Sequence, residues 1–322
     1  MIDSIDQYIS ERQSESNKKN CERSLYRFYV YMDNHSLDVQ DLSQSKLQVY
    51  ARYLREDQNL ASATASNEFN HIRGWLKSIN RGDLLEEFNY SKHLERTTHK
   101  DQGKESDQYL TEDEYRLLLD SVDTKYPHRD YLIIRSFVEL GCRPMELANI
   151  RKDDLDIDNR SVWINGVKGS NSRTVYFSET FKAKLKAWLN EHRGKFKIAS
   201  ESDYLLVSER SEKISQQAIN KAIKKTAESA GLQSSYAKTA DGRNLNSVTA
   251  TTLRHSYATL RLQNTPGTQQ MDPKTLSKLM GHTQIEDSTT SAYINPRKDL
   301  KQADDECRPK LISLEKKVTE NI

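Results

Sequence analysis

The chain has 322 residues, of which 30% are charged, and its 49 lysines and arginines nearly balance its 47 aspartates and glutamates, so the formal net charge is +2. This length suggests about two domains. The near balance of charge excludes a chain that is basic throughout, so any binding to nucleic acid must depend on how the positive charges are distributed. Three scattered cysteines exclude a disulfide framework or a zinc finger, and no apolar stretch is long enough to span a bilayer, so we expect a soluble cytoplasmic protein that does not enter a membrane.

Three amphipathic runs with helical spacing occupy the N-terminal region. They cover residues 21–32, 47–54 and 69–79, and Ser43 is suited to cap the second run. The spacing predicts a small helical bundle as the first domain, residues 1–95.

A polar segment follows this bundle. Residues 96–107 mix both charges and carry no apolar anchor, which is typical of a linker. Thr111 and Glu114 then have the pattern of a capping box, which predicts the first helix of a second domain over residues 108–297. Residues 298–322 form a charged tail with a few apolar positions.

The second domain contains one clear strand signal. Residues 161–177 have the composition of two β-rich runs joined by a Gly/Asn/Ser turn, with Lys168 near the tip of the predicted hairpin. Asp154, Asp156 and Asp158 alternate with apolar residues, which favours an edge strand, because a calcium loop would need a glycine and a glutamate that are absent. There is also no phosphate-binding Gly-rich loop, so we predict neither a metal nor a nucleotide cofactor.

Another helix start is predicted late in this domain. Asp272 is suited to cap a helix whose first residue is Pro273. The predicted helix ends where the chain reads Gly281-His282.

Two arginines, a histidine, a lysine and a tyrosine in this domain suit chemistry on a phosphodiester. Arg143 and Arg254 can each give parallel hydrogen bonds to phosphate oxygens without losing a proton, and so stabilise the extra charge of a pentacoordinate state. Tyr293 can attack phosphorus and form a covalent phosphotyrosine. His282 can bond to the phosphate or share the tyrosine proton, and Lys168 can protonate the departing 5′ oxygen.

These residues lie in short motifs. The motifs are Gly-x-Arg-x-x-Glu-Leu at 141–147, Leu-Arg-His-Ser-Tyr-Ala-Thr at 253–259, Leu-Met-Gly-His at 279–282 and Thr-Thr-x-x-Tyr at 289–293. In this order the chain resembles the tyrosine recombinases, the phage-integrase and Xer-type family of enzymes that break and rejoin DNA. The resemblance implies a mainly α (α+β) fold, with an N-terminal SAM-like helical core-binding domain and a mixed catalytic domain that holds a small antiparallel sheet.

The resemblance also assigns residues around the chemistry. It implies that Arg173, in a Lys-Gly-x-x-x-Arg pattern with Lys168, contacts DNA, and that Glu146 and His255 have supporting roles. It implies DNA contacts at the start of the last main helix of the first domain. The residues in that place are Ser62, Thr64, Ser66, Asn67 and Arg73.

The chain departs from the family pattern at two places. The family usually has histidine or lysine three positions before the second arginine, where this chain has Thr251. A threonine can donate a hydrogen bond to phosphate but cannot carry charge or act as a general acid at neutral pH. The segment from His282 to Tyr293 is also slightly longer than usual.

The function that the resemblance implies is site-specific DNA recombination or integration, as carried out for mobile genetic elements. Cleavage and rejoining would proceed through a 3′-phosphotyrosine and a Holliday junction. The implied partners are double-stranded DNA with inverted half-sites, a homotetramer in the synaptic complex and DNA-bending accessory proteins. The protein itself would be associated with the nucleoid in the cytoplasm. The tail, residues 298–322, would be exchanged between subunits.

Two alternatives stay open at this stage. One is a catalytically weakened accessory factor that only binds DNA, which Thr251 favours. The other is a topoisomerase or telomere resolvase that shares the nucleophile but not the strand exchange.

Overall fold

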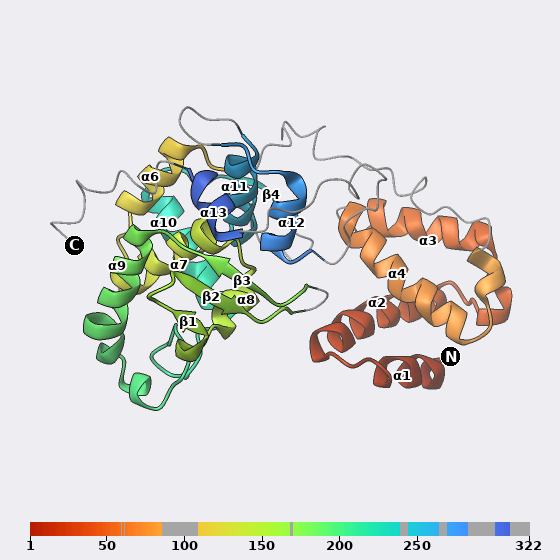
Figure 1. The fold of residues 1–322 in the computed structure, drawn as a ribbon. Helices are drawn as coiled ribbons and strands as arrows, with labels where there is room; N and C mark the ends of the chain where they lie inside the picture. Colours follow the sequence, from red (N-terminus) through yellow and green to blue (C-terminus); the bar gives the residue numbers. More distant parts are fainter. Residues whose placement is uncertain are drawn as a thin grey trace. The chain divides into compact units, whose positions relative to one another are not determined.

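The computed structural model describes residues 1–58, 60, 62–85, 109–167, 170–238, 244–263, 269–282 and 300–309. The chain divides into two compact units, one comprising Met1–Ser106 with Ala237–Leu245 and the other comprising Asp107–Tyr236 and Asn246–Ile322. Figure 1 shows the helices of the first unit and the mixed elements of the second. No helix within the described residues is long and apolar enough to cross a membrane.

The described part of the first unit is a helical bundle, as the sequence predicts. Ser43 accepts a hydrogen bond from the backbone of Lys46 and so caps its helix, and Asn80 ends the last main helix with a left-handed backbone, φ 59°. The elements are α1 (Ile2–Ser10), α2 (Glu15–Asn34), η1 (Val39–Asp41), α3 (Gln44–Glu56), α4 (Ser62–Ser78) and η2 (Gly82–Leu85).

Aromatic side chains fill the core of this bundle. The ring of Phe28 meets Tyr50 edge-on at 4.7 Å and Trp75 at 6.1 Å, and all three side chains are buried. These rings come from α2, α3 and α4, so their packing fixes the three helices against one another. The exposed face of α4 is therefore held on a rigid support.

The second unit surrounds a small sheet with helices. Thr111 and Glu114 form the predicted capping box, and Asp272 caps the helix that begins at Pro273. The elements before the sheet are α6 (Glu112–Asp120), α7 (Pro127–Leu140), α8 (Pro144–Asn149) and η4 (Lys152–Asp154). The elements after it are α9 (Glu179–Ala187), η5 (Trp188–His192), η6 (Arg193–Lys195), η7 (Lys197–Ser200), α10 (Gln216–Ser229), α11 (Ala250–Leu262), α12 (Pro273–Met280) and α13 (Leu300–Glu306). Strands β4 (Ser235–Lys238) and β5 (Asn244–Asn246) pair with each other, and the division between the two units runs through both of them.

The larger sheet has three antiparallel strands in the order β1 (Leu155–Asp156), β2 (Ser161–Ile164) and β3 (Arg173–Tyr176). Strands β2 and β3 form the predicted hairpin, with Ile164 opposite Arg173. The predicted edge strand is real but only two residues long. It is shorter than predicted for a different reason at each end. Before the strand, Asp154 ends a 3-10 turn. After it, the side chain of Asp156 accepts hydrogen bonds from Asn159, and these bonds bend the chain.

Helix α7 is the central element of the second unit. Its side chains from Leu132 to Leu140 are all buried, and it packs against α10, α11 and α9. A helix buried on all sides needs partners for its charged groups, and α7 carries Arg135 and Glu139 in this interior. Its C-terminus at Gly141 leads directly to the first of the predicted motifs.

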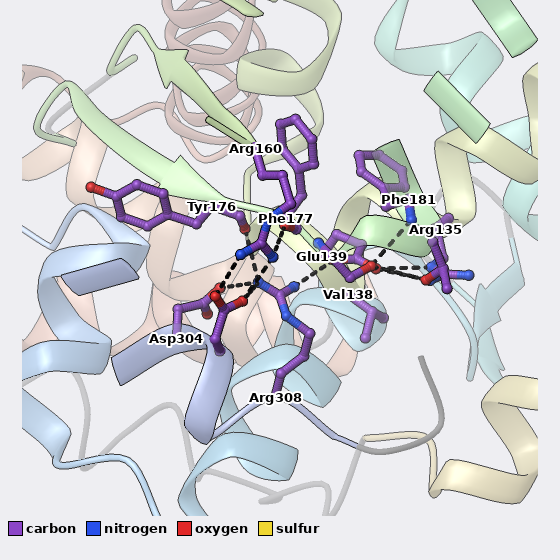
Figure 2. A network of polar contacts seen from close by, with 12 residues as sticks. Arg135, Val138, Glu139, Arg160, Tyr176, Phe177, Phe181, Asp304 and Arg308 are labelled. Atoms are coloured by element: carbon purple, nitrogen blue, oxygen red, sulfur yellow. Dashed lines mark hydrogen bonds and ion pairs between the residues drawn. The ribbon is translucent and has the colours of Figure 1, made fainter. Parts of the chain in front are cut away.

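The described part of the tail packs into the second unit of its own chain. Figure 2 shows Arg308 reaching Glu139 of α7 and Asp304 of α13. Asp304 also accepts a hydrogen bond from Arg261 at 3.1 Å, and both side chains are buried. Residues 300–309 thus belong to this core, whereas the apolar positions of residues 310–322, on which an exchange between subunits would depend, lie outside the described residues.

Candidate active site

Two glycines with left-handed backbones place the predicted catalytic residues at helix ends. Gly141 (φ 56°) ends α7 two residues before Arg143, and Gly281 (φ 71°) ends α12 one residue before His282. A β-carbon on Gly281 would lie 2.5 Å from Nη1 of Arg173. Glycine is therefore required there both for the backbone angle and for space.

Arg143 occupies the N-cap position of α8 with a partly open side chain. Its backbone N–H donates to Oε2 of Glu146 at 2.8 Å, and its Nη1 donates to Oε1 of the same carboxylate at 3.3 Å. Its side chain is 35% exposed, so part of the guanidinium can be reached from the solvent. These free donors are what a phosphate would need.

Arg254 is more deeply placed and joins three segments. It projects from α11 and donates to the carbonyl oxygens of Gly141 and Met280 at the ends of α7 and α12. Burial, and then the nearby charge of Arg143, lower the pKa of Arg254 to about 10. It still carries its charge at neutral pH, and its contacts hold it in one orientation.

His282 completes the group. Its Nε2 lies 3.4 Å from Nη2 of Arg254. Burial, and then the charges of Arg254, Arg143 and Arg173, lower the pKa of His282 below its ordinary value, so the ring is neutral at pH 7. A neutral ring can accept a proton or a hydrogen bond at one nitrogen and donate at the other.

Glu146 is the carboxylate that organises these cations. Its side chain is fully buried, and it accepts hydrogen bonds from Arg143, from Ser170 at 2.7 Å and from Arg173 at 3.1 Å. Nη1 of Arg254 lies 3.8 Å from its Oε2. Burial alone would raise the pKa of Glu146, but the hydrogen bonds from Arg173, the Arg143 backbone and Ser170 lower it, so the group is ionised.

Arg173, for which the resemblance implies a contact with DNA, has its side chain inside the second unit. This residue is only 7% exposed, and besides its bonds to Glu146 its Nε donates to the carbonyl oxygen of Leu279 at 2.6 Å. Because its guanidinium is already engaged inside the protein, Arg173 ties the hairpin to the end of α12. Its role is to position Glu146 and the segment that carries His282.

The hairpin and the α12 end are joined by backbone contacts as well. The backbone N–H of Asn171 donates to the carbonyl oxygen of Gly281 at 3.1 Å, and Ser170 pairs with His282 in an isolated bridge. Ser170 and Asn171 were not among the site residues predicted from the motifs. Their place beside Lys168 in the turn was the only signal that could have indicated them.

A groove of about 1060 Å³ opens over the two arginines. Arg143, Arg254 and His282 line it, and so do Thr251 and His255, which are exposed one turn apart on α11. Thr251 is therefore placed where the family has histidine or lysine, facing the same space as the arginines. His255, which the sequence assigned a supporting role, faces the groove instead of the core.

Two of the predicted catalytic residues, Lys168 and Tyr293, lie outside the described residues. The described residues next to Lys168 are Val167, which lines the groove, and Ser170, which bonds to Glu146.

The predicted DNA contacts of the first unit lie on one helix. Asn67 and Arg73 are exposed on α4, and Thr64 and Ser66 are half-buried. Ser62 begins the same helix, but its side chain lies outside the described residues. Lys77 is exposed on the same face, one turn after Arg73, and helical spacing could have added it to the prediction.

The arrangement in the second unit is suited to an anionic ligand. Among the described residues, Arg143, Arg173 and Arg254 surround one carboxylate, that of Glu146, which gives a surplus of two positive charges beside a neutral histidine. A phosphodiester brings one negative charge, and attack on it adds another. Among the described residues no group of three or more histidine, cysteine, aspartate or glutamate side chains is placed to hold a metal ion.

Comparison with protein families gives two matches that together cover most of the chain. Residues 108–299 match the Phage integrase family, and residues 1–101 match the Phage integrase SAM-like domain. The first match covers more than half of the chain and contains all the motifs that line the groove.

Individual relatives agree with these matches. The tyrosine recombinase XerC of Caldanaerobacter subterraneus subsp. tengcongensis is 32% identical over 185 residues, which is 58% of this chain but only 46% of that protein. The tyrosine recombinase XerD of Oceanobacillus iheyensis is 27% identical over 289 residues, 88% of this chain and 89% of that protein. The chain thus spans less than half the length of the first relative.

A solved structure shows the same fold at low identity. A lambda integrase tetramer bound to a Holliday junction is 15% identical, with a TM-score of 0.57, over 92% of this chain and 78% of that chain. At this identity the likeness is one of fold alone.

Proposed function

Because the chain belongs to the phage integrase family of tyrosine recombinases, we propose that it is a site-specific DNA recombinase that cuts and rejoins DNA in the groove of its second unit. The observation that carries this proposal is the pair of arginines, Arg143 and Arg254, held around the buried Glu146 with an excess of positive charge. Such a site stabilises the charge that develops when a phosphodiester is attacked.

The nucleophile in this proposal is Tyr293. Its phenol oxygen attacks the phosphorus, the bond to the 5′ oxygen breaks, and a 3′-phosphotyrosine forms while the 5′ oxygen leaves as a hydroxyl. Lys168 supplies the proton to that oxygen. Because the phosphotyrosine conserves the energy of the broken bond, a second 5′ hydroxyl can reseal the strand without ATP.

The tyrosine must also lose a proton. The pKa of a free phenol is about 10, so only a small fraction is ionised at pH 7. His282, neutral and 3.4 Å from Arg254, is the described residue best suited to share that proton. Thr251 can only donate a hydrogen bond to the phosphate.

DNA binding is shared between the two units in this proposal. The exposed face of α4, with Asn67 and Arg73, contacts the sugar-phosphate backbone of a half-site. Inverted half-sites then bring protomers together as a homotetramer that exchanges strands through a Holliday junction, with help from DNA-bending proteins. The lambda integrase tetramer bound to a Holliday junction, which has the same fold, supports this assembly.

The test is a covalent adduct assay. Nicked duplexes from the DNA that flanks the gene are incubated with the wild-type protein and with Tyr293→Phe, and products are separated in SDS. We expect an SDS-resistant protein–DNA band that is absent from the variant, while both proteins shift the DNA equally in a native gel.

The adduct assay, together with assays of supercoil relaxation and of junction formation, separates the rival functions. An accessory factor that only binds DNA, which Thr251 favours, would shift the duplex but give no adduct with either protein. A topoisomerase would form the adduct but relax supercoiled DNA without producing junctions between two marked duplexes. Either result would replace the recombinase proposal.

A further inference from the structure

A second cavity lies at the opposite end of α7 from Arg143. It has a volume of about 590 Å³ and is bounded by Lys125–Arg129 at the start of α7, by side chains of residues 188–197 and by the Glu209–Arg210 loop. At 1.5 Å per residue, the 14 residues of α7 separate its two ends by roughly 20 Å. No described residue of the candidate active site lines this cavity, so its composition needs another explanation.

The cavity is strongly basic. Lys125, Arg129, Lys195, Lys197 and Arg210 line it, against the single carboxylate of Glu209. Glu209 is paired with Lys125 at 2.7 Å, and Arg129 is paired with its neighbour Asp130 at 2.8 Å. Among the described residues Lys195 and Lys197 form no ion pair, whereas Arg210 shares the charge of Glu209 with Lys125. Five cations against the carboxylates of Glu209 and Asp130 leave three positive charges for an anion.

Its wall is aromatic. The rings of Tyr126 and Phe196 lie 5.1 Å apart, and Trp188 meets Phe196 edge-on at 5.8 Å. The guanidinium of Arg129 covers the ring of Tyr126 at 4.3 Å. Cations beside aromatic faces are the combination that binds a base together with its phosphate.

Two histidines extend this wall with a flat surface. The rings of His128 and His192 are stacked at 3.5 Å with an interplanar angle of 8°. Burial lowers the pKa of both, and nearby Lys195 and Lys184 lower it further, so the stacked rings are neutral at pH 7. Neutral rings pack face to face without repulsion and keep their nitrogens for hydrogen bonds.

We propose that this cavity binds a nucleotide, with the phosphate at Lys195, Lys197 and Arg210 and the base against the partly exposed rings of Tyr126 and the two histidines. Trp188 and Phe196 are 2% and 8% exposed, so they support this wall from within. Its volume lies within the range of about 300–1,000 Å³ that small-molecule sites occupy. The nucleotide is either a free nucleoside phosphate or the terminal nucleotide of a single DNA strand, because the two share the same chemistry. The proposal is independent of the recombinase activity.

Calorimetric titration of the full chain with adenosine monophosphate, adenosine and inorganic phosphate tests it. We expect saturable binding of the nucleotide, tighter than that of either part. A Lys195→Gln/Lys197→Gln double variant should bind adenosine monophosphate about tenfold more weakly or worse, because two charge-assisted contacts are lost. Both lysines are exposed, so the variant should fold.

A Lys186→Gln/Lys221→Gln double variant is the matched control. It removes the same charge from exposed positions outside the cavity and should bind like the wild type. A 5′-phosphorylated single-stranded oligonucleotide that displaces adenosine monophosphate would identify a strand end as the source, and one that does not would identify a free nucleotide.

Three results would overturn the proposal. The first is no saturable binding at millimolar nucleotide. The second is inorganic phosphate that binds as tightly as adenosine monophosphate, because the aromatic wall would then contribute nothing. The third is equal nucleotide affinity in the cavity variant and its matched control.

Discussion

Two clusters in the second unit are built from the same groups, a buried glutamate bridged by arginines, yet they differ in balance and access. Around Glu139 the network contains four arginines and four carboxylates, which are Arg135, Arg160, Arg261 and Arg308 with Glu139, Asp304, Asp305 and Glu179. Around Glu146 three arginines meet one carboxylate. The first cluster is closed by α13 and the second opens on the groove.

The difference shows how one chemistry can serve two purposes. A balanced cluster whose central side chains, those of Glu139, Asp304 and Arg308, are buried has little capacity for a ligand, and its effect is to join α13 to α7, as Figure 2 shows. An unbalanced cluster beside a groove keeps donors free for an incoming anion. Loss of the buried carboxylate should therefore reduce stability in the first case, and loss of an open arginine should reduce activity in the second.

The largest effect is expected for Glu139→Gln. This change removes the carboxylate that Arg135 and Arg308 share inside the protein, and breaking a buried pair in this way costs about 3–5 kcal/mol. Urea unfolding of the variant measures the loss. Glu179→Gln is the matched control, because Glu179 is 71% exposed and its pair with Arg160 should contribute little. Equal midpoints for the two variants would mean that the closed cluster does not stabilise the fold.

The next effect is expected for Arg143→Ala. Its side chain is partly exposed, so we expect an unchanged melting temperature but a loss of on the order of a hundredfold or more in the rate of strand cleavage. Single-turnover formation of the covalent adduct on nicked DNA measures the rate, and a gel shift checks affinity. A variant that cleaves normally would remove the open cluster from the chemistry.

The response to acid should be shared by both clusters. The pKa values of Glu139 and Glu146 are lowered in the fold, because the hydrogen bonds and charges of their partners exceed the opposing effect of burial. Their stabilisation is therefore complete above the unfolded value of about 4.5 and is lost as the pH falls through the folded value.

Urea unfolding at several acidic pH values measures this response. We expect the free energy of unfolding of the wild type to fall as the pH drops below 4.5, and to fall less steeply in Glu139→Gln, which has lost one of the two titrating groups. Parallel curves for the two proteins would show that Glu139 does not titrate in this way.

The smallest effect is expected for Thr251→His, which restores the residue that the family usually has beside the arginines. The new ring would face the groove and could take the tyrosine proton, so we expect the rate of cleavage to rise about tenfold. This is less than general-base catalysis usually contributes, because His282 is already present. Adduct formation at neutral pH measures the change. If the rate is unaltered, proton removal from Tyr293 does not limit cleavage in this chain.

Local sequence patterns determined the elements of this protein and the order of its motifs. Ser43, Thr111 with Glu114, and Asp272 were recognised as caps because capping depends on a side chain and the backbone two or three residues away. The β2–β3 hairpin was predicted for the same reason, since its turn and its strands are contiguous in the chain. Arg143, Arg254 and His282 were identified from their motifs, and in the structure they line one groove.

Only the tertiary structure decided which charged groups meet. The exposed or buried state of Arg173 depends on Glu146, 27 residues earlier, and on Leu279, 106 residues later. The anchoring of α13 depends on Arg308 and Glu139, which are 169 residues apart. Contacts between such distant residues leave no local pattern in the sequence, because they arise from how α7, β3, α11 and α12 pack. This packing leaves the arginines around Glu146 open to a groove and encloses those around Glu139.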